Sequence, residues 1–140
     1  MIDQNTAQTA AIGSISSGNL VRTRETTNLF LDSNISQSVR DAYRTRNLVA
    51  LATSTRMKNA SGTIVAQSSI SYDEYSLTPS GSVASWTDPQ TTYRGNATTM
   101  SHWVDTTGTY LQTHRYYDQF GNVLTAVDAN GKQSHLDYSK

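Results

Sequence analysis

The sequence predicts a mostly β fold, built of antiparallel β-hairpins that follow one another along the chain as a meander or curled sheet. Only 36% of the 140 residues are hydrophobic and 16% are charged, so Ser, Thr, Asn and Gln fill much of the chain. These residues favour strands and turns when they alternate with Val, Ile and Tyr. The chain has 8 tyrosines against 2 phenylalanines, which suits the half-buried faces of a sheet.

A four-residue segment with Asp or Asn first and Gly fourth recurs over the last 82 residues of the chain. The four copies are residues 59–62, 105–108, 118–121 and 128–131. In such a segment the first side chain accepts a hydrogen bond from the backbone two residues on, and the glycine takes the positive φ that closes a type I turn with a bulge. Strand-like runs frame each copy, so we expect a meander of β-hairpin repeats.

The first part of the chain is less regular. Residues 1–19 are too polar to order themselves and are predicted to be a flexible arm. Residues 20–47 form a connector that begins with a strand over 20–31. Ile35, Val39 and Tyr43 then recur at helical spacing behind Ser33, a candidate N-cap. A short helix near 35–43 is one interpretation of this pattern, and an extended connector is the other.

Residues 48–140 form the predicted hairpin region. The expected strand pairs are 48–58 with 63–72, 97–104 with 109–117, and 122–127 with 132–138. Between the first two pairs, residues 77–90 hold both prolines and predict a longer loop around a short strand at 82–87. Trp86 is the expected hydrophobic anchor of that loop.

The composition argues against several classes of function. The formal net charge is +0, so no basic surplus is available for nucleic acid. The chain has no run of 18 apolar residues that would span a membrane, and its first residues lack the basic and apolar regions of a signal peptide. Without cysteine there are no disulfides or thiolate metal sites. We expect no cofactor.

Catalytic and metal-binding patterns are weak. His102 and His114 flank the turn at 105–108 and could approach each other across that hairpin, with Asp105 or His135 as the nearest third ligand. The favoured interpretation is that they are solvent-facing or hydrogen-bonded histidines of the strands. No compact ligand spacing supports a metal site, however. No nucleophile-elbow glycine pattern is present, and the aspartates are better explained as turn formers. The sequence therefore predicts a protein that is not an enzyme.

Aromatic residues gather between positions 86 and 117. Trp86, Trp103 and Tyr110 are the candidates for contact with a ligand or a partner, because Trp and Tyr on a sheet face stack on sugar rings or lie at protein interfaces. The alternative is that these aromatic side chains form the core of a domain that is poor in phenylalanine.

The repeated residues resemble those of the Rhs or YD-repeat family, in which Tyr-Asp, Gly, Asp and Gly recur around short strands. The matching residues are Tyr72, Asp73, Tyr117, Asp118, Gly121, Asn122, Asp128, Gly131 and Tyr138. The full unit starts at Tyr117, and Tyr138 lies 21 residues later. Residues 59–73 resemble a half-unit and residues 94–117 a stretched one.

The resemblance implies a structural role. Family repeats build a continuous sheet that winds into a hollow shell on secreted or cell-surface proteins, many of them bacterial and toxin-carrying; in these repeats Tyr packs between successive turns while Asp and Gly form them. The family's self-cleaving Asp-Pro-x-Gly signature has no counterpart, since Asp88-Pro89 is followed by Gln90-Thr91. The resemblance thus implies an extracellular or cell-surface segment that pairs with copies of itself or with the rest of a larger chain. The alternative is a carbohydrate-binding or adhesion module that uses its surface Trp and Tyr.

Overall fold

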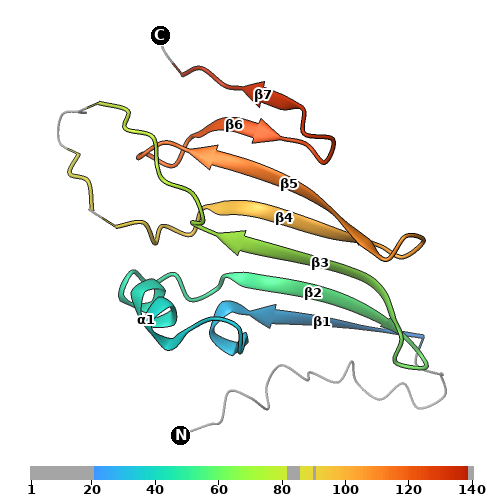
Figure 1. Ribbon diagram of the computed structural model, residues 1–140. Helices are drawn as coiled ribbons and strands as arrows, with labels where there is room; N and C mark the ends of the chain where they lie inside the picture. The colour runs from blue at the N-terminus through green and yellow to red at the C-terminus, as the bar shows by residue number, and fades with distance from the viewer. Residues whose placement is uncertain (1–20, 82–85, 90, 139–140) are drawn as a thin grey trace, which may run out of the picture.

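A computed structural model describes residues 21–81, 86–89 and 91–138. In these residues seven strands form one antiparallel sheet in which spatial order follows chain order, from β1 at one edge to β7 at the other (Figure 1). The elements are β1 (Arg22–Asn28), the 3₁₀ turn η1 (Leu29–Leu31), α1 (Gln37–Thr45), β2 (Ala52–Asn59), β3 (Ile64–Tyr72), β4 (Ala97–Val104), β5 (Thr109–Tyr117), β6 (Val123–Val127) and β7 (Gln133–His135). The predicted fold, a mostly β meander with one short helix, is confirmed.

The three predicted hairpins are present as β2–β3, β4–β5 and β6–β7. The bounds of β4 and β5 agree with the sequence pattern at every end. The strand predicted to start at residue 48 starts at Ala52 instead, because the preceding residues connect α1 to the sheet. Of the short strand predicted at 82–87, residues 82–85 lie outside the described residues, and 86 and 87 form no strand. The predicted arm at 1–19 also lies outside them.

Helix α1 exists, but its N-cap is Ser36 and not Ser33. The Ser36 hydroxyl accepts a hydrogen bond from the Val39 N–H, which a Ser three residues earlier would not reach. The helix ends in a Schellman motif: Asn47 takes a positive φ of 58°, and the Leu48 N–H bonds the Tyr43 carbonyl. Both ends of this short helix are therefore capped.

Three of the four predicted turns share one hydrogen-bond pattern. In the turns that start at Asn59, Asp118 and Asp128, the first side chain accepts bonds from the backbone N–H groups two and four residues on. The fourth turn departs from the prediction. Its Gly108 N–H bonds the carbonyl of Val104, so the hydrogen bond that closes this hairpin uses the residue before Asp105. Two strand residues that pair directly, Val104 and Thr109, set this loop length.

The turns at 59–62, 105–108 and 128–131 lie at one end of the sheet, and the longer connections lie at the other. Figure 1 shows α1 and the loop after β3 together at this second end. Each connection is closed by the same backbone bond from an N–H to a carbonyl. The bonds run from Leu29 to Leu51, from Asp73 to Asn96 and from Asp118 to Asn122. The first two connections are long insertions and the third is a tight turn, so one repeated joint accepts very different loops.

The hydrophobic core is small. Among the described residues only Leu29, Tyr43 and Tyr117 are buried hydrophobic side chains. All three lie at the end of the sheet that carries α1 and the turn at 118–122. The other buried side chains that the structure describes are polar, and they are Thr53, Thr98, Thr99, Ser101 and Asp118. Figure 1 shows one layer of strands, with the helix over one end only. No second layer of described residues therefore covers most of either sheet face.

Candidate functional site

The predicted repeat tyrosines occupy equivalent places in the sheet. The Tyr72 hydroxyl donates to the Ala52 carbonyl at 2.8 Å, and the Tyr117 hydroxyl donates to the Ala97 carbonyl at 2.9 Å. Positions 52 and 97, like positions 72 and 117, differ by 45 residues. Each tyrosine thus reaches across its own hairpin and ties the end of one strand to the start of the other.

Asp118 closes the tight turn that follows β5. Its Oδ1 accepts bonds from the N–H groups of Phe120 and Asn122, and its Oδ2 accepts one from the Asn122 side chain. Gly121 has a φ of +88°, which a residue with a Cβ adopts only with strain. Burial by itself raises the pKa of Asp118, but hydrogen bonds, mainly from Asn122, outweigh burial and hold that pKa below its usual value. This carboxylate is committed to the turn.

Asp73 makes the same kind of turn with residues more than twenty positions away. Its Oδ2 accepts bonds from the N–H groups of Arg94 and Gly95 at 2.8 and 2.7 Å, and its Oδ1 accepts one from the Asn96 N–H at 3.0 Å. The triplet of residues 94–96 corresponds to residues 120–122 of the Asp118 turn. Residues 74–93 are therefore an insertion into a repeat turn, and Asp73 holds the two ends of that insertion together.

The Asp73 carboxylate also accepts a hydrogen bond from helix α1. The Tyr43 hydroxyl of α1 donates to Asp73 Oδ2 at 2.8 Å. Burial and this bond raise the pKa of Tyr43 well above its usual value, so the phenol stays protonated and remains a donor. With Oδ2 fully used, the buried Nδ2 of Asn96 finds no partner among the described residues, whereas the corresponding Asn122 bonds Asp118.

The two long connections, residues 29–51 and 74–95, also bond the next turn along the sheet. The first connection supplies Tyr43 to the Asp73 turn. The second supplies Thr78, which forms a parallel bridge with Asp118, and Arg94, whose guanidinium donates to the Gln119 carbonyl and to the Asp88 carboxylate. We call residues 29–51 and 74–95 the straps. They link neighbouring repeats at one end of a sheet that has no second layer over it.

The remaining predicted repeat residues lie in the last hairpin. Asp128 and Gly131 form its turn, with Gly131 at a φ of +81°. Tyr138 does not repeat the behaviour of Tyr72 and Tyr117, because its side chain is 53% exposed. It follows β7, where no described strand lies beyond to cover it.

The three predicted contact aromatics do not form one surface. Trp103 and Tyr110 are directly opposite each other on β4 and β5, next to the turn at 105–108. Trp86 belongs to the second strap at the other end of the sheet, where its ring packs edge-on against Phe120 at 4.6 Å. Trp86 therefore anchors its loop, as expected, and only the other two share a sheet face.

That face continues along β5 as a row of rings. His114 and Tyr116 lie on the same side of β5 as Tyr110, because alternate residues of a strand share a face. Tyr75 of the second strap stacks on Tyr116 at 4.6 Å, and its hydroxyl bonds His114 Nδ1 at 2.9 Å. Tyr110 is 46% and Tyr116 38% exposed. The sheet thus presents a flat aromatic row to solvent.

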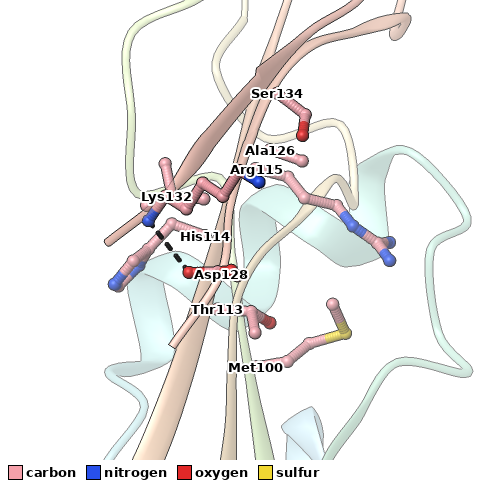
Figure 2. Close-up of a pocket in the computed structure, with 9 residues that line it drawn as sticks. Met100, Thr113, His114, Arg115, Ala126, Asp128, Lys132 and Ser134 are labelled. Carbon is pink, nitrogen blue, oxygen red and sulfur yellow. Dashed lines mark hydrogen bonds between the residues drawn. The ribbon is translucent and has the colours of Figure 1, made fainter. Parts of the chain in front are cut away.

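The opposite face holds a shallow depression of about 400 Å³ over β4 to β7 (Figure 2). Met100 and Ala126 contribute apolar atoms, while Arg115 and Lys132 contribute positive charge. Asp128 also lines it, but its Oδ1 already accepts the Lys132 backbone N–H, the dashed bond in Figure 2. The depression is open and holds no pair of free acid and base groups suited to catalysis.

His102 and His114 do not approach each other; His102 is exposed and His114 is hydrogen-bonded, as the favoured interpretation expects. His102 pairs with Leu111 and His114 with Thr99, so the two imidazoles project from opposite faces of the sheet. In the part of the chain that the structure describes, no group of three His, Asp or Glu side chains is placed to hold a metal ion. No described helix is long and apolar enough to cross a membrane.

Sequence reasoning missed three residues that hold the straps, namely Tyr43, Tyr75 and Arg94. Their roles depend on contacts over long sequence separations, which composition and local spacing do not report. One signal was present: Gly95-Asn96 repeats Gly121-Asn122, and Tyr72-Asp73 repeats Tyr117-Asp118. Joining the half-unit to the stretched one would have revealed the inserted strap.

Comparisons of the chain with family models, with curated proteins and with solved structures gave no match. The functional interpretation therefore rests on the sheet, its repeated turns and its two edge strands, β1 and β7, each of which has one neighbour among the described strands.

Proposed function

We propose that the chain is a non-enzymatic structural segment, a β-repeat sheet that resembles part of an Rhs or YD-repeat shell and acts by pairing its edges with other strands. The supporting observation is the open seven-stranded sheet, in which β1 and β7 each have one neighbour. Unpaired edge N–H and C=O groups are a template for strand addition. The partner is another copy of the chain or the rest of a longer one, in an extracellular or cell-surface setting.

The small core supports the same proposal. Three buried hydrophobic side chains remove little apolar surface from water compared with a globular domain of this length. A sheet of this kind gains stability when further strands or layers extend it. The same backbone hydrogen bond recurs at its joints, two of which carry straps. This recurrence suits a unit that is repeated within a larger sheet.

Size-exclusion chromatography with light scattering tests this function. We expect species larger than the monomer, with a fraction that rises with protein concentration. A monomer at every concentration would count against an assembling segment.

The aromatic row favours a second function, a carbohydrate-binding or adhesion module. Trp103 and Tyr110 form a directly opposed pair on one face, and Tyr116 continues the row. Such flat ring surfaces suit stacking against sugars. Tryptophan fluorescence measured across a glycan panel distinguishes this function, with Trp103→Phe as the variant that loses the signal and Trp86→Phe as the control that keeps it. A flat response across the panel would remove this alternative.

A further inference from the structure

The two edges of the sheet differ in charge. Strand β1 exposes Arg22, Arg24 and Glu25. Strand β7 carries Gln133, Ser134 and His135, and none of the three is Arg, Lys, Asp or Glu. Charged side chains on an edge strand discourage pairing with another sheet. The chain therefore has one protected edge and one edge without this protection.

Strand direction limits how copies can join. Each neighbouring pair in the seven-stranded sheet is antiparallel, so β1 and β7 run in the same direction. A head-to-tail join of β7 to the β1 of a copy in the same orientation would be a parallel ladder, and every head-to-tail join would use the charged edge. Two copies related by a two-fold axis perpendicular to the sheet would instead place identical strands antiparallel, which is the more stable pairing.

Strand β1 is poorly suited to that two-fold pairing. A two-fold axis perpendicular to the sheet leaves each side chain on its own face, and side chains alternate between faces along a strand. Two residues that lie directly opposite each other must therefore both have even or both have odd position numbers. In registers centred on any of residues 22 to 25, arginine therefore meets arginine or Glu25 meets Glu25. Like charges directly opposite are destabilising.

Strand β7 has the opposite properties. Along an antiparallel strand, successive residues direct their backbone N–H and C=O groups alternately to the two sides. The Leu136 N–H bonds the Leu124 carbonyl of β6 at 2.9 Å, so every second residue, counted from Leu136, faces β6 and the residues between face away from it. His135 and Gln133 thus point N–H and C=O groups to the open edge.

We propose that the β7 edge binds the β7 edge of a second copy of this chain, antiparallel about a two-fold axis, to give a closed dimer with one continuous sheet. The inference rests on the proposed structural function and assigns the partner of one of its edges. It excludes a filament built by joining β7 to β1.

The test compares two substitutions at one position. His135→Pro removes the outward N–H but leaves the β6–β7 ladder intact, since this N–H does not contribute to it, and proline is tolerated at such edge positions. His135→Ala keeps the N–H and removes only the imidazole, which bonds Thr125 Oγ1 at 3.0 Å. We expect His135→Pro to weaken the dimer about tenfold or more, and His135→Ala to change the dissociation constant by less than about threefold. Analytical ultracentrifugation gives both values.

Thr26→Lys on the β1 edge is the second control and should leave the dimer unchanged. A dimer that persists in His135→Pro, or one that is lost in Thr26→Lys or His135→Ala, overturns the β7 assignment while the structural function stands. Species that grow beyond a dimer overturn the closed two-fold arrangement alone. A wild-type monomer at every concentration overturns both proposals.

If His135→Pro fails to fold by circular dichroism, hydrogen exchange on the wild type decides the question. We expect the His135 amide to exchange slowly in concentrated dimer and quickly after dilution, with no such change at Thr26. An equal rate in both samples would overturn the inference.

Discussion

Two aspartates, Asp73 and Asp118, each follow a tyrosine at the end of a strand, but they connect parts of the chain that lie at very different sequence separations. Asp118 joins residues that are four positions apart, whereas Asp73 joins the ends of a twenty-residue insertion and also receives the Tyr43 hydroxyl of α1. Each accepted hydrogen bond to a carboxylate is stronger than one to a neutral group. Asp73 is therefore the residue through which the first strap, the second strap and the sheet are connected.

Asp73→Ala should lower the free energy of unfolding by about 3–5 kcal/mol, because it leaves three backbone N–H groups and a buried phenol without their acceptor. Urea denaturation followed by circular dichroism measures the change. Asp105→Ala is the matched control and should cost less than about 0.5 kcal/mol, since its hairpin closes on Val104. Equal losses in the two variants would contradict this assignment.

The lowered pKa of Asp118 makes stability depend on pH in acid. Because its pKa in the folded chain is below the value of 3.8 expected when unfolded, the carboxylate contributes stability above about pH 4 and loses it as the pH falls through the folded pKa. Asp118→Asn should keep the turn, as Asn59 does in its own turn, and should flatten the acid limb of the stability curve. Thermal unfolding between pH 2 and pH 7 in both proteins checks this, allowing for Asp32, whose pKa is lowered too. An unchanged acid slope would show that Asp118 is not responsible.

At the scale of elements, hairpins and straps follow different rules. The hairpins β2–β3, β4–β5 and β6–β7 are local, and the position of each turn follows from Asp or Asn and Gly in the sequence. The straps are not local: each leaves the sheet at a repeat joint and contacts the next turn. Helix α1 is stable here because Ser36 and Asn47 cap it and because Tyr43 is buried against the sheet, since a helix this short is marginal alone.

If residues 74–93 are an insertion, most of them can be removed without loss of the sheet. Deleting 74–92 leaves Asp73-Tyr93-Arg94-Gly95-Asn96, which has the spacing of the turn from Asp118 to Asn122. We expect the shortened chain to keep its β circular dichroism and dispersed amide spectrum, with lower stability because the Thr78 bridge and the Tyr75 stack are lost.

The same deletion combined with Gly95→Val is the control for turn geometry. Gly95 has a φ of +79°, which a β-branched residue adopts only at considerable cost. The double variant should unfold at much lower denaturant concentration than the deletion alone. Loss of structure in the simple deletion would mean that the strap is required for the sheet to form.

At the scale of the whole molecule, the sheet is wide and its buried apolar surface is small. Stability in such an arrangement comes mainly from backbone pairing between neighbouring strands, and it increases when an edge finds a partner. In the proposed dimer, the unequal charge of β1 and β7 selects the edge that pairs.

Assembly should therefore be visible in the melting temperature. We expect the Tm of the wild-type chain to rise with protein concentration, because association removes folded monomer from the equilibrium. In His135→Pro the Tm should be independent of concentration. Differential scanning fluorimetry over a dilution series measures both, and a constant wild-type Tm would argue against a partner at either edge.

The sequence by itself determined the strands and their turns, because alternation and the Asp/Asn-to-Gly segments act over a few residues. It placed β4 and β5 correctly, and it assigned three of the four turns their hydrogen bonds. Only the tertiary structure decided that Asp73 completes its turn with Gly95 and Asn96, that His102 and His114 lie on opposite faces, and that Trp86 is far from Trp103. These features depend on strand register and on contacts between distant residues, and the energies that fix them appear only when the whole sheet is assembled.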